Sequence, residues 1–188
     1  MKYVTCLAFA FVVLAGSQGS AQAPAGGQKF TLTQGLQRSY NGIKLNLTEA
    51  ADKLPDAQYN YRPSPEIRTY GGQLRHVAFF HYVFCSAAKG EPNPNKEDLE
   101  KKTTKAEFVK ALADSFAYCD PVFAALTDET ALQLVKQGQN EVARGSVLSN
   151  LISHDNEEYG IITVYLRTKD LVPPSTERAQ RGRAGRGQ

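Results

Sequence analysis

The sequence predicts an all-α protein, and more specifically a four-helix bundle. Four long stretches place apolar residues three and four positions apart, which is the spacing of one helix face. No Asn-Gly or Asp-Gly pair lies between two alternating segments, a pattern that would mark a β-hairpin. Helices with one apolar face bury it by packing against one another. At 188 residues the chain has room for one such domain and a tail.

The first helix is expected over about residues 33–53, where apolar side chains recur at helical spacing. Pro55 stops it, because proline cannot continue a helix. Residues 56–68 contain two further prolines and no helical period, so they form a long irregular crossover between the first two helices. The second helix is expected from the N-cap Thr69 to about Ala88, and its largely apolar surface indicates a buried position.

The third helix has a capping-box signal, because Thr104 is followed three residues later by Glu107. Pro121 lies inside its apolar pattern, which resumes as far as Leu126. We therefore expect a kink at the proline and not a clean stop. Residues 128–139 lack a helical period and are expected to form a partly extended connector before the fourth helix.

The fourth helix is expected from Asn140 or Glu141 to about Asp170, so the bundle covers residues 30–176. Residues 177–188 carry four arginines against one glutamate and are expected to form a disordered Arg-rich tail. Contact of this tail with a membrane surface or an anionic polymer is the alternative. The rest of the mature chain is close to neutral, and nothing in it indicates nucleic-acid binding.

Residues 1–21 have the pattern of a secretory signal peptide. Lys2 gives a positive start, an apolar stretch runs to about Ala15, and small residues precede cleavage after Ala21 or Ala23. Ala21 is favoured, because Pro24 directly after the cut is unfavourable. The apolar stretch is too short to span a bilayer. We therefore expect a bacterial protein that is exported, periplasmic or secreted, with no membrane span.

Two cysteines remain after the signal, Cys85 in the second predicted helix and Cys119 in the third. An even number in an oxidising compartment fits a disulfide if these helices are neighbours. Two buried thiols are the alternative, because unpaired cysteine is also common in protein cores.

Three side chains could meet as ligands of a divalent metal ion. His154 and Glu158 are four residues apart in the apolar helical run 147–168, so they lie one turn apart on one face. His76 lies in the second predicted helix, and the three ligands converge if the two helices pack face to face. Two imidazoles and a carboxylate suit Zn²⁺, Ni²⁺ or Fe²⁺. A satisfied core histidine and a solvated glutamate are the alternatives.

Neighbouring polar residues are weaker candidates. His81 lies about 140° round the helix from His76. It is expected to pack or hydrogen-bond, and a supporting role behind the ligands stays open. Glu157 points about 100° away from Glu158, and Asp155 is also expected on another face. No catalytic residue and no organic cofactor is assigned.

Segments of two helices carry a family likeness: residues 154–160, 164–167 and 171–175 in the last helix, and residues 72–78 and 84–92 in the second. They resemble the DinB-like proteins, the DinB/YfiT-like metalloenzyme superfamily, and the likeness spans roughly residues 30–176. The resemblance implies a four-helix bundle with a divalent metal held by three histidines, at the positions of His76, His154 and Glu158. This chain departs from that pattern at the third ligand. Some relatives are transferases or isomerases that use low-molecular-weight thiols.

The leading hypothesis is an exported metal-binding bundle, either a metal-dependent hydrolase or a thiol-dependent transferase, with an unknown small-molecule substrate. Export weakens the hypothesis of a thiol-dependent transferase, since small cytosolic thiols are scarce outside the cell membrane. The alternative is a non-catalytic binding or structural bundle that has lost its metal site, which the glutamate at position 158 suggests. Bundles of this kind can pair through an exposed helix face, so a homodimer stays open.

Overall fold

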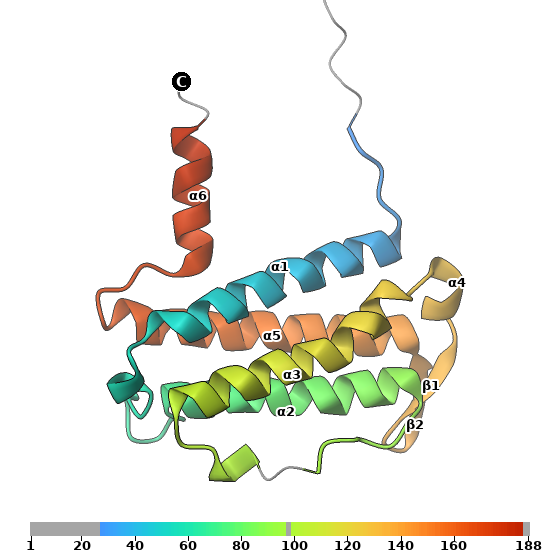
Figure 1. The fold of residues 1–188 in the computed structure, drawn as a ribbon. Helices are drawn as coiled ribbons and strands as arrows, with labels where there is room; N and C mark the ends of the chain where they lie inside the picture. Colours follow the sequence, from blue (N-terminus) through green and yellow to red (C-terminus); the bar gives the residue numbers. More distant parts are fainter. Residues whose placement is uncertain (1–26, 97–98, 186–188) are drawn as a thin grey trace, which may run out of the picture.

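The computed structural model describes residues 27–96 and 99–185, and four long helices account for most of them (Figure 1). They are α1 (Leu32–Lys53), α2 (Tyr70–Lys89), α3 (Lys105–Ala124) and α5 (Arg144–Arg167). α2 packs against α3 and α5, and α1 packs against the same two helices. This is a four-helix bundle, so the predicted fold class is confirmed. The predicted signal peptide lies outside the described residues.

Capping residues set the helix boundaries. Thr69 accepts a hydrogen bond from the Gly72 backbone N–H at the start of α2. Thr104 and Glu107 form the predicted capping box of α3. Gly90 ends α2 with φ = 72°, a left-handed conformation that suits glycine. These contacts span only a few residues, which explains why sequence patterns located these ends well.

The long crossover between α1 and α2 is irregular apart from one 3₁₀ turn, η1 (Asp56–Gln58), as predicted. Tyr59, just after this turn, is buried, and its hydroxyl donates to the Ala51 carbonyl of α1. A second 3₁₀ turn, η2 (Leu99–Lys101), precedes α3. Pro121 lies inside α3, which continues to Ala124, so the proline does not stop the helix.

The connector before α5 contains a β-hairpin that the sequence pattern did not predict. A short helix, α4 (Asp128–Ala131), leads into β1 (Leu134–Gln137), which pairs antiparallel with β2 (Asn140–Ala143). Gly138, with φ = 62°, takes the first position of the two-residue turn. Because residues 140–143 pair with β1, α5 begins at Arg144. The prediction that this helix starts at Asn140 or Glu141 is therefore wrong.

The predicted disordered tail is helical over most of its length. The helix α6 (Pro174–Ala184) stands away from the bundle in Figure 1. Arg178 pairs with Glu49 on α1, and a Glu177 carboxylate oxygen lies 2.6 Å from Lys53 Nζ. These ion pairs tie the start of α6 to α1, a contact that composition could not reveal. The prediction of disorder is wrong up to residue 184, and residues 186–188 lie outside the described part.

A disulfide joins Cys85 on α2 to Cys119 on α3, with Cα atoms 5.6 Å apart. Both residues are fully buried in the apolar core. Of the two alternatives for these cysteines, the structure has the disulfide. Within the described residues, no helix combines the length and the apolar character that crossing a membrane requires.

Candidate metal centre

The three predicted metal ligands come together between α2 and α5. His76 lies near the start of α2, and His154 and Glu158 lie in the middle of α5, one turn apart. Side chains four residues apart share one helix face, and α2 packs directly against α5. Local spacing therefore places the two α5 ligands together, and helix packing brings His76 to them.

The ligand atoms form a small triangle. His76 Nε2 lies 3.3 Å from His154 Nε2 and 3.3 Å from Glu158 Oε1. His154 Nε2 lies 3.7 Å from the same oxygen. Atoms about 2.0–2.2 Å from one tetrahedrally coordinated ion lie about 3.3–3.6 Å from one another. The triangle therefore has nearly the size that a single Zn²⁺-like ion requires.

The carboxylate of Glu158 also fits a cation at this point. The residue is only 5% exposed. Its Oε2 is buried and has no hydrogen-bond partner among the described residues. A buried carboxylate is stabilised by a cation or by hydrogen-bond donors. A metal ion would supply a positive charge directly at this carboxylate.

The electrostatic environment favours the neutral form of the His76 imidazole. Burial lowers the pKa of His76 to about 4, and the positive charge of Arg68 acts in the same direction. His76 is therefore neutral at pH 7, which is the form that ligates a metal. Burial raises the pKa of the Glu158 carboxyl, while His154 opposes this shift. A bound cation would favour the ionised carboxylate.

A comparison with family models finds a match that covers the candidate site. The model described as the DinB superfamily matches residues 45–162, which is more than half of the chain and includes all three candidate ligands. The chain belongs to the DinB superfamily. The likeness carried by the second and last helices is thereby confirmed. Among proteins with curated descriptions, none matches the chain.

Three solved structures share the fold of this DinB superfamily protein. A DinB-like protein from Bacillus cereus has a TM-score of 0.65 and 19% identity, over 75% of this chain and 95% of that one. A DinB-like protein from Bacillus subtilis has a TM-score of 0.61 and 16% identity, over 73% and 93%. A conserved protein from Enterococcus faecalis has a TM-score of 0.58 and 18% identity, over 74% and 96%. At these identities the likeness concerns the fold alone.

Phenyl rings of α2 line one side of the centre in this DinB superfamily protein. The Phe80 ring centroid lies 4.7 Å from that of His76 and 4.6 Å from that of His154. The ring centroid of Phe84 lies 6.0 Å from that of His154. Phe79 packs against Phe80 and is 46% exposed. This wall limits water on one side of the site and offers an apolar surface at its edge.

Behind the α5 histidine, the bundle buries a polar network. Asp155, which was expected on another face, is fully buried, and its Oδ2 lies 2.9 Å from His81 Nε2. His81 Nδ1 lies 2.8 Å from Ser115 Oγ on α3, so His81 hydrogen-bonds as predicted. The sequence contained one indication of this burial, because Asp155 falls at helical spacing among the apolar residues of α5. Glu157 is exposed, in agreement with its dismissal as a ligand.

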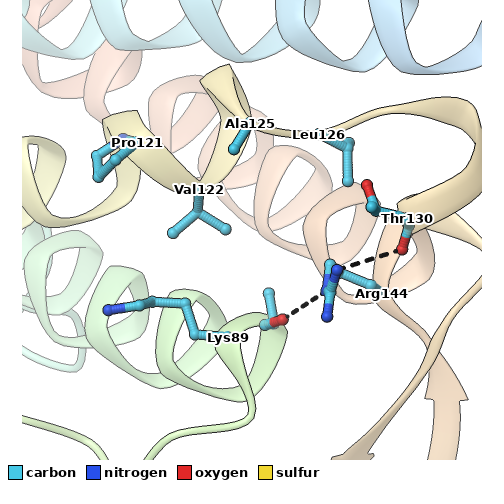
Figure 2. Close-up of a pocket in the computed structure, with 8 residues that line it drawn as sticks. Lys89, Pro121, Val122, Ala125, Leu126, Thr130 and Arg144 are labelled. Atoms are coloured by element: carbon cyan, nitrogen blue, oxygen red, sulfur yellow. Dashed lines mark hydrogen bonds between the residues drawn. The ribbon is translucent and has the colours of Figure 1, made fainter.

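A separate pocket of about 410 Å³ lies where α2 and α3 end and α5 begins (Figure 2). Lys89 at its edge lies about 20 Å along α2 from His76, so this pocket is not part of the metal centre. Figure 2 shows Arg144 donating to the carbonyls of Ala88 and Thr130, at 2.8 and 3.5 Å. The guanidinium thus faces the negative end of α2, which gives Arg144 a structural role.

Proposed function

We propose that this protein is an exported metal-dependent hydrolase of the DinB superfamily, in which His76, His154 and Glu158 hold one divalent ion such as Zn²⁺, Ni²⁺ or Fe²⁺. The convergence of the three ligand atoms carries the proposal, because they all lie within 4.8 Å of one another. When bound, the ion would act as a Lewis acid that activates water or polarises a substrate carbonyl. The three side chains hold and orient it, and Glu158 supplies the negative charge.

Hydrolysis is better supported than the thiol-dependent transfer known for some relatives. The Cys85–Cys119 disulfide fits an oxidising compartment, where low-molecular-weight thiols are scarce. Three protein ligands leave a coordination position for water. The side chains of His76 and His154 are 19% and 17% exposed, so a small molecule can approach the centre from solvent.

A titration with Zn²⁺ tests the metal site. The wild-type protein is expected to bind a single ion, and His76→Ala and His154→Ala are expected to lose tight binding. Zn²⁺ should also raise the Tm of the wild type, and a chelator should lower it again. Equal metal content in the three proteins, or no Tm shift with Zn²⁺, Ni²⁺ or Mn²⁺, would support the non-catalytic bundle.

The surroundings favour a substrate with an apolar part and an anionic group. Phe79 and Phe80 present an apolar surface, and Arg68 is close enough to lower the pKa of His76 and to act in the same direction on Glu158. Phenylacetate is therefore expected to raise the Tm of the Zn²⁺-loaded protein more than phenylacetamide does. Arg68→Gln should abolish the difference. Equal shifts in the wild type would exclude a preference for anions.

Export has its own test. The N-terminus of the protein recovered from the cell envelope or the medium is expected to be Gln22, the residue after the favoured cleavage site. A protein that stays in the cytoplasm and keeps residues 1–21 would exclude export while leaving the metal site unaffected.

A further inference from the structure

We propose that Asp155 is a positioning residue for the metal centre. Held in place by His81 and Ser115, it fixes His154 in the tautomer that presents Nε2 to the metal. The inference rests on the proposed metal function, but its core is a statement about one proton on one ring. That statement can be tested with no metal present.

The geometry connects Asp155 to the ligand directly. His154 turns its Nε2 toward His76 and Glu158. The opposite ring nitrogen, Nδ1, lies 3.5 Å from Asp155 Oδ1. Both of these atoms are buried, and neither has another hydrogen-bond partner among the described residues. A slightly shorter distance between Nδ1 and Oδ1 would give both atoms a hydrogen bond. Within residues 27–96 and 99–185, no other group forms one with either atom.

The second oxygen of Asp155 is anchored from two other helices. Oδ2 lies 2.9 Å from His81 Nε2 on α2, and His81 Nδ1 lies 2.8 Å from Ser115 Oγ on α3. Ser115 Oγ in turn donates to the Leu112 carbonyl at 2.8 Å. All three side chains of this network are fully buried. The carboxylate is therefore fixed from α2 and, through His81, from α3.

Proton positions follow from the partners. The Leu112 carbonyl can only accept, so the Ser115 hydroxyl donates to it and itself accepts from His81 Nδ1–H. His81 Nε2 then either carries a second proton that it donates to ionised Asp155, or accepts one from protonated Asp155 Oδ2. In both cases Asp155 Oδ1 remains an acceptor. It therefore favours a proton on His154 Nδ1 and leaves Nε2 free as a ligand.

This arrangement also gives the metal-free centre a consistent set of hydrogen bonds. With His154 Nε2 unprotonated, His76 Nε2–H can donate across the 3.3 Å that separates the two rings. Of the two imidazoles, only His76 would then have to give up its Nε2 proton to bind a metal, because His154 already has the ligating form.

Imidazole ¹⁵N NMR tests the proposal on the metal-free protein. The chain contains 3 histidines, so the spectrum resolves into individual rings and His76→Ala assigns one of them directly. Wild-type His154 is expected as the Nδ1–H tautomer. In Asp155→Ala, which removes the acceptor for Nδ1, His154 should lose its preference for Nδ1–H and populate the Nε2–H tautomer. Zn²⁺ affinity should then fall by about 10–100-fold, as for other supports of metal-bound histidine.

Asp120→Ala is the matched control. Asp120 is a carboxylate on α3 that accepts from Tyr40 and Lys44, at 2.9 and 2.7 Å. Its replacement removes a bundle hydrogen bond without touching a ligand, so the His154 tautomer and the Zn²⁺ affinity should stay at wild-type values. A loss of affinity in this control equal to that in Asp155→Ala would overturn the proposal, because it would show that the loss comes from a general destabilisation of the bundle.

Asp155→Leu decides the matter if Asp155→Ala does not fold. This change also removes the acceptor for His154 Nδ1, and it fills the space of the carboxylate with an apolar side chain. The same shift of the His154 tautomer and the same loss of Zn²⁺ affinity are expected. An Nε2–H tautomer in the wild type, or an unchanged tautomer in the variants that fold, would overturn the proposal. A wild type that binds no Zn²⁺ but shows Nδ1–H would refute only the metal function.

Discussion

Glu158 distinguishes the candidate site from the family pattern, because it stands where the family resemblance implies a third histidine. A carboxylate adds a negative charge that imidazole lacks, and here it lies within 3.7 Å of both histidine nitrogens. The neighbouring Glu157 is exposed on the helix surface. One helix therefore carries two adjacent glutamates with different environments, and only one of them faces the metal centre.

Glu158→Gln is expected to weaken Zn²⁺ binding by about tenfold or more, because it removes the anionic ligand and keeps the side-chain volume. Isothermal titration of both single variants checks this. Glu157→Gln is the control and should bind like the wild type. An equal loss in the two variants would mean that the general negative charge of α5 matters, and not ligation by Glu158.

At the scale of elements, caps explain which helices the sequence located well. Glu107 Oε2 accepts from the backbone N–H groups of Thr103 and Thr104, at 3.0 and 2.9 Å. These hydrogen bonds lower the pKa of the Glu107 carboxyl to about 2. At a pH between about 2 and 4.5, the Glu107 carboxyl is therefore less protonated in the folded protein than in the unfolded protein. Its contribution to stability is therefore present above about pH 4.5 and is lost as pH falls toward 2.

Glu107→Gln is accordingly expected to flatten the acid dependence of stability between about pH 2 and 4.5. Urea midpoints measured in steps across this range should fall more steeply with decreasing pH in the wild type than in the variant. Glu141→Gln, at an exposed position in β2, provides the comparison and should follow the wild type. Parallel slopes for all three proteins would contradict the assigned role of the cap.

At the scale of the whole molecule, the disulfide joins α2 and α3 at the level of the buried network. Cys85 lies one helical turn beyond His81 on α2, and Cys119 lies one turn beyond Ser115 on α3. The bond closes a loop with a sequence separation of 34 residues. It therefore constrains the unfolded chain. It also fixes the relative positions of α2 and α3, which carry His81 and Ser115, the residues that anchor Asp155.

Replacement of both cysteines by alanine is expected to lower the free energy of unfolding by about 3–4 kcal/mol, the entropy of closing a loop of this length. Guanidinium unfolding with and without a reductant measures the effect. The reductant should destabilise the wild type to a similar extent and leave the double variant unchanged. A wild type that is insensitive to complete reduction would exclude a stabilising role for the bond.

The sequence by itself determined the features that depend on contacts within a turn or two. These include the four long helices, the starts at Thr69 and Thr104, and the shared face of His154 and Glu158. Each results from helical periodicity or from a side chain that caps its own backbone. The same local reasoning missed the hairpin, although Gly138 was the turn residue available as a signal, because strand pairing depends on the partner segment.

Only the tertiary structure decided what happens between distant segments. Packing of α2 on α5 brought His76 to its partners, and packing of α2 on α3 chose a disulfide over two free thiols. Contacts with α1 ordered α6, and the bundle core turned Asp155 into a bonded partner of His81. The physical reason is that these interactions join groups far apart in the chain, so their energies depend on helix packing and not on local pattern.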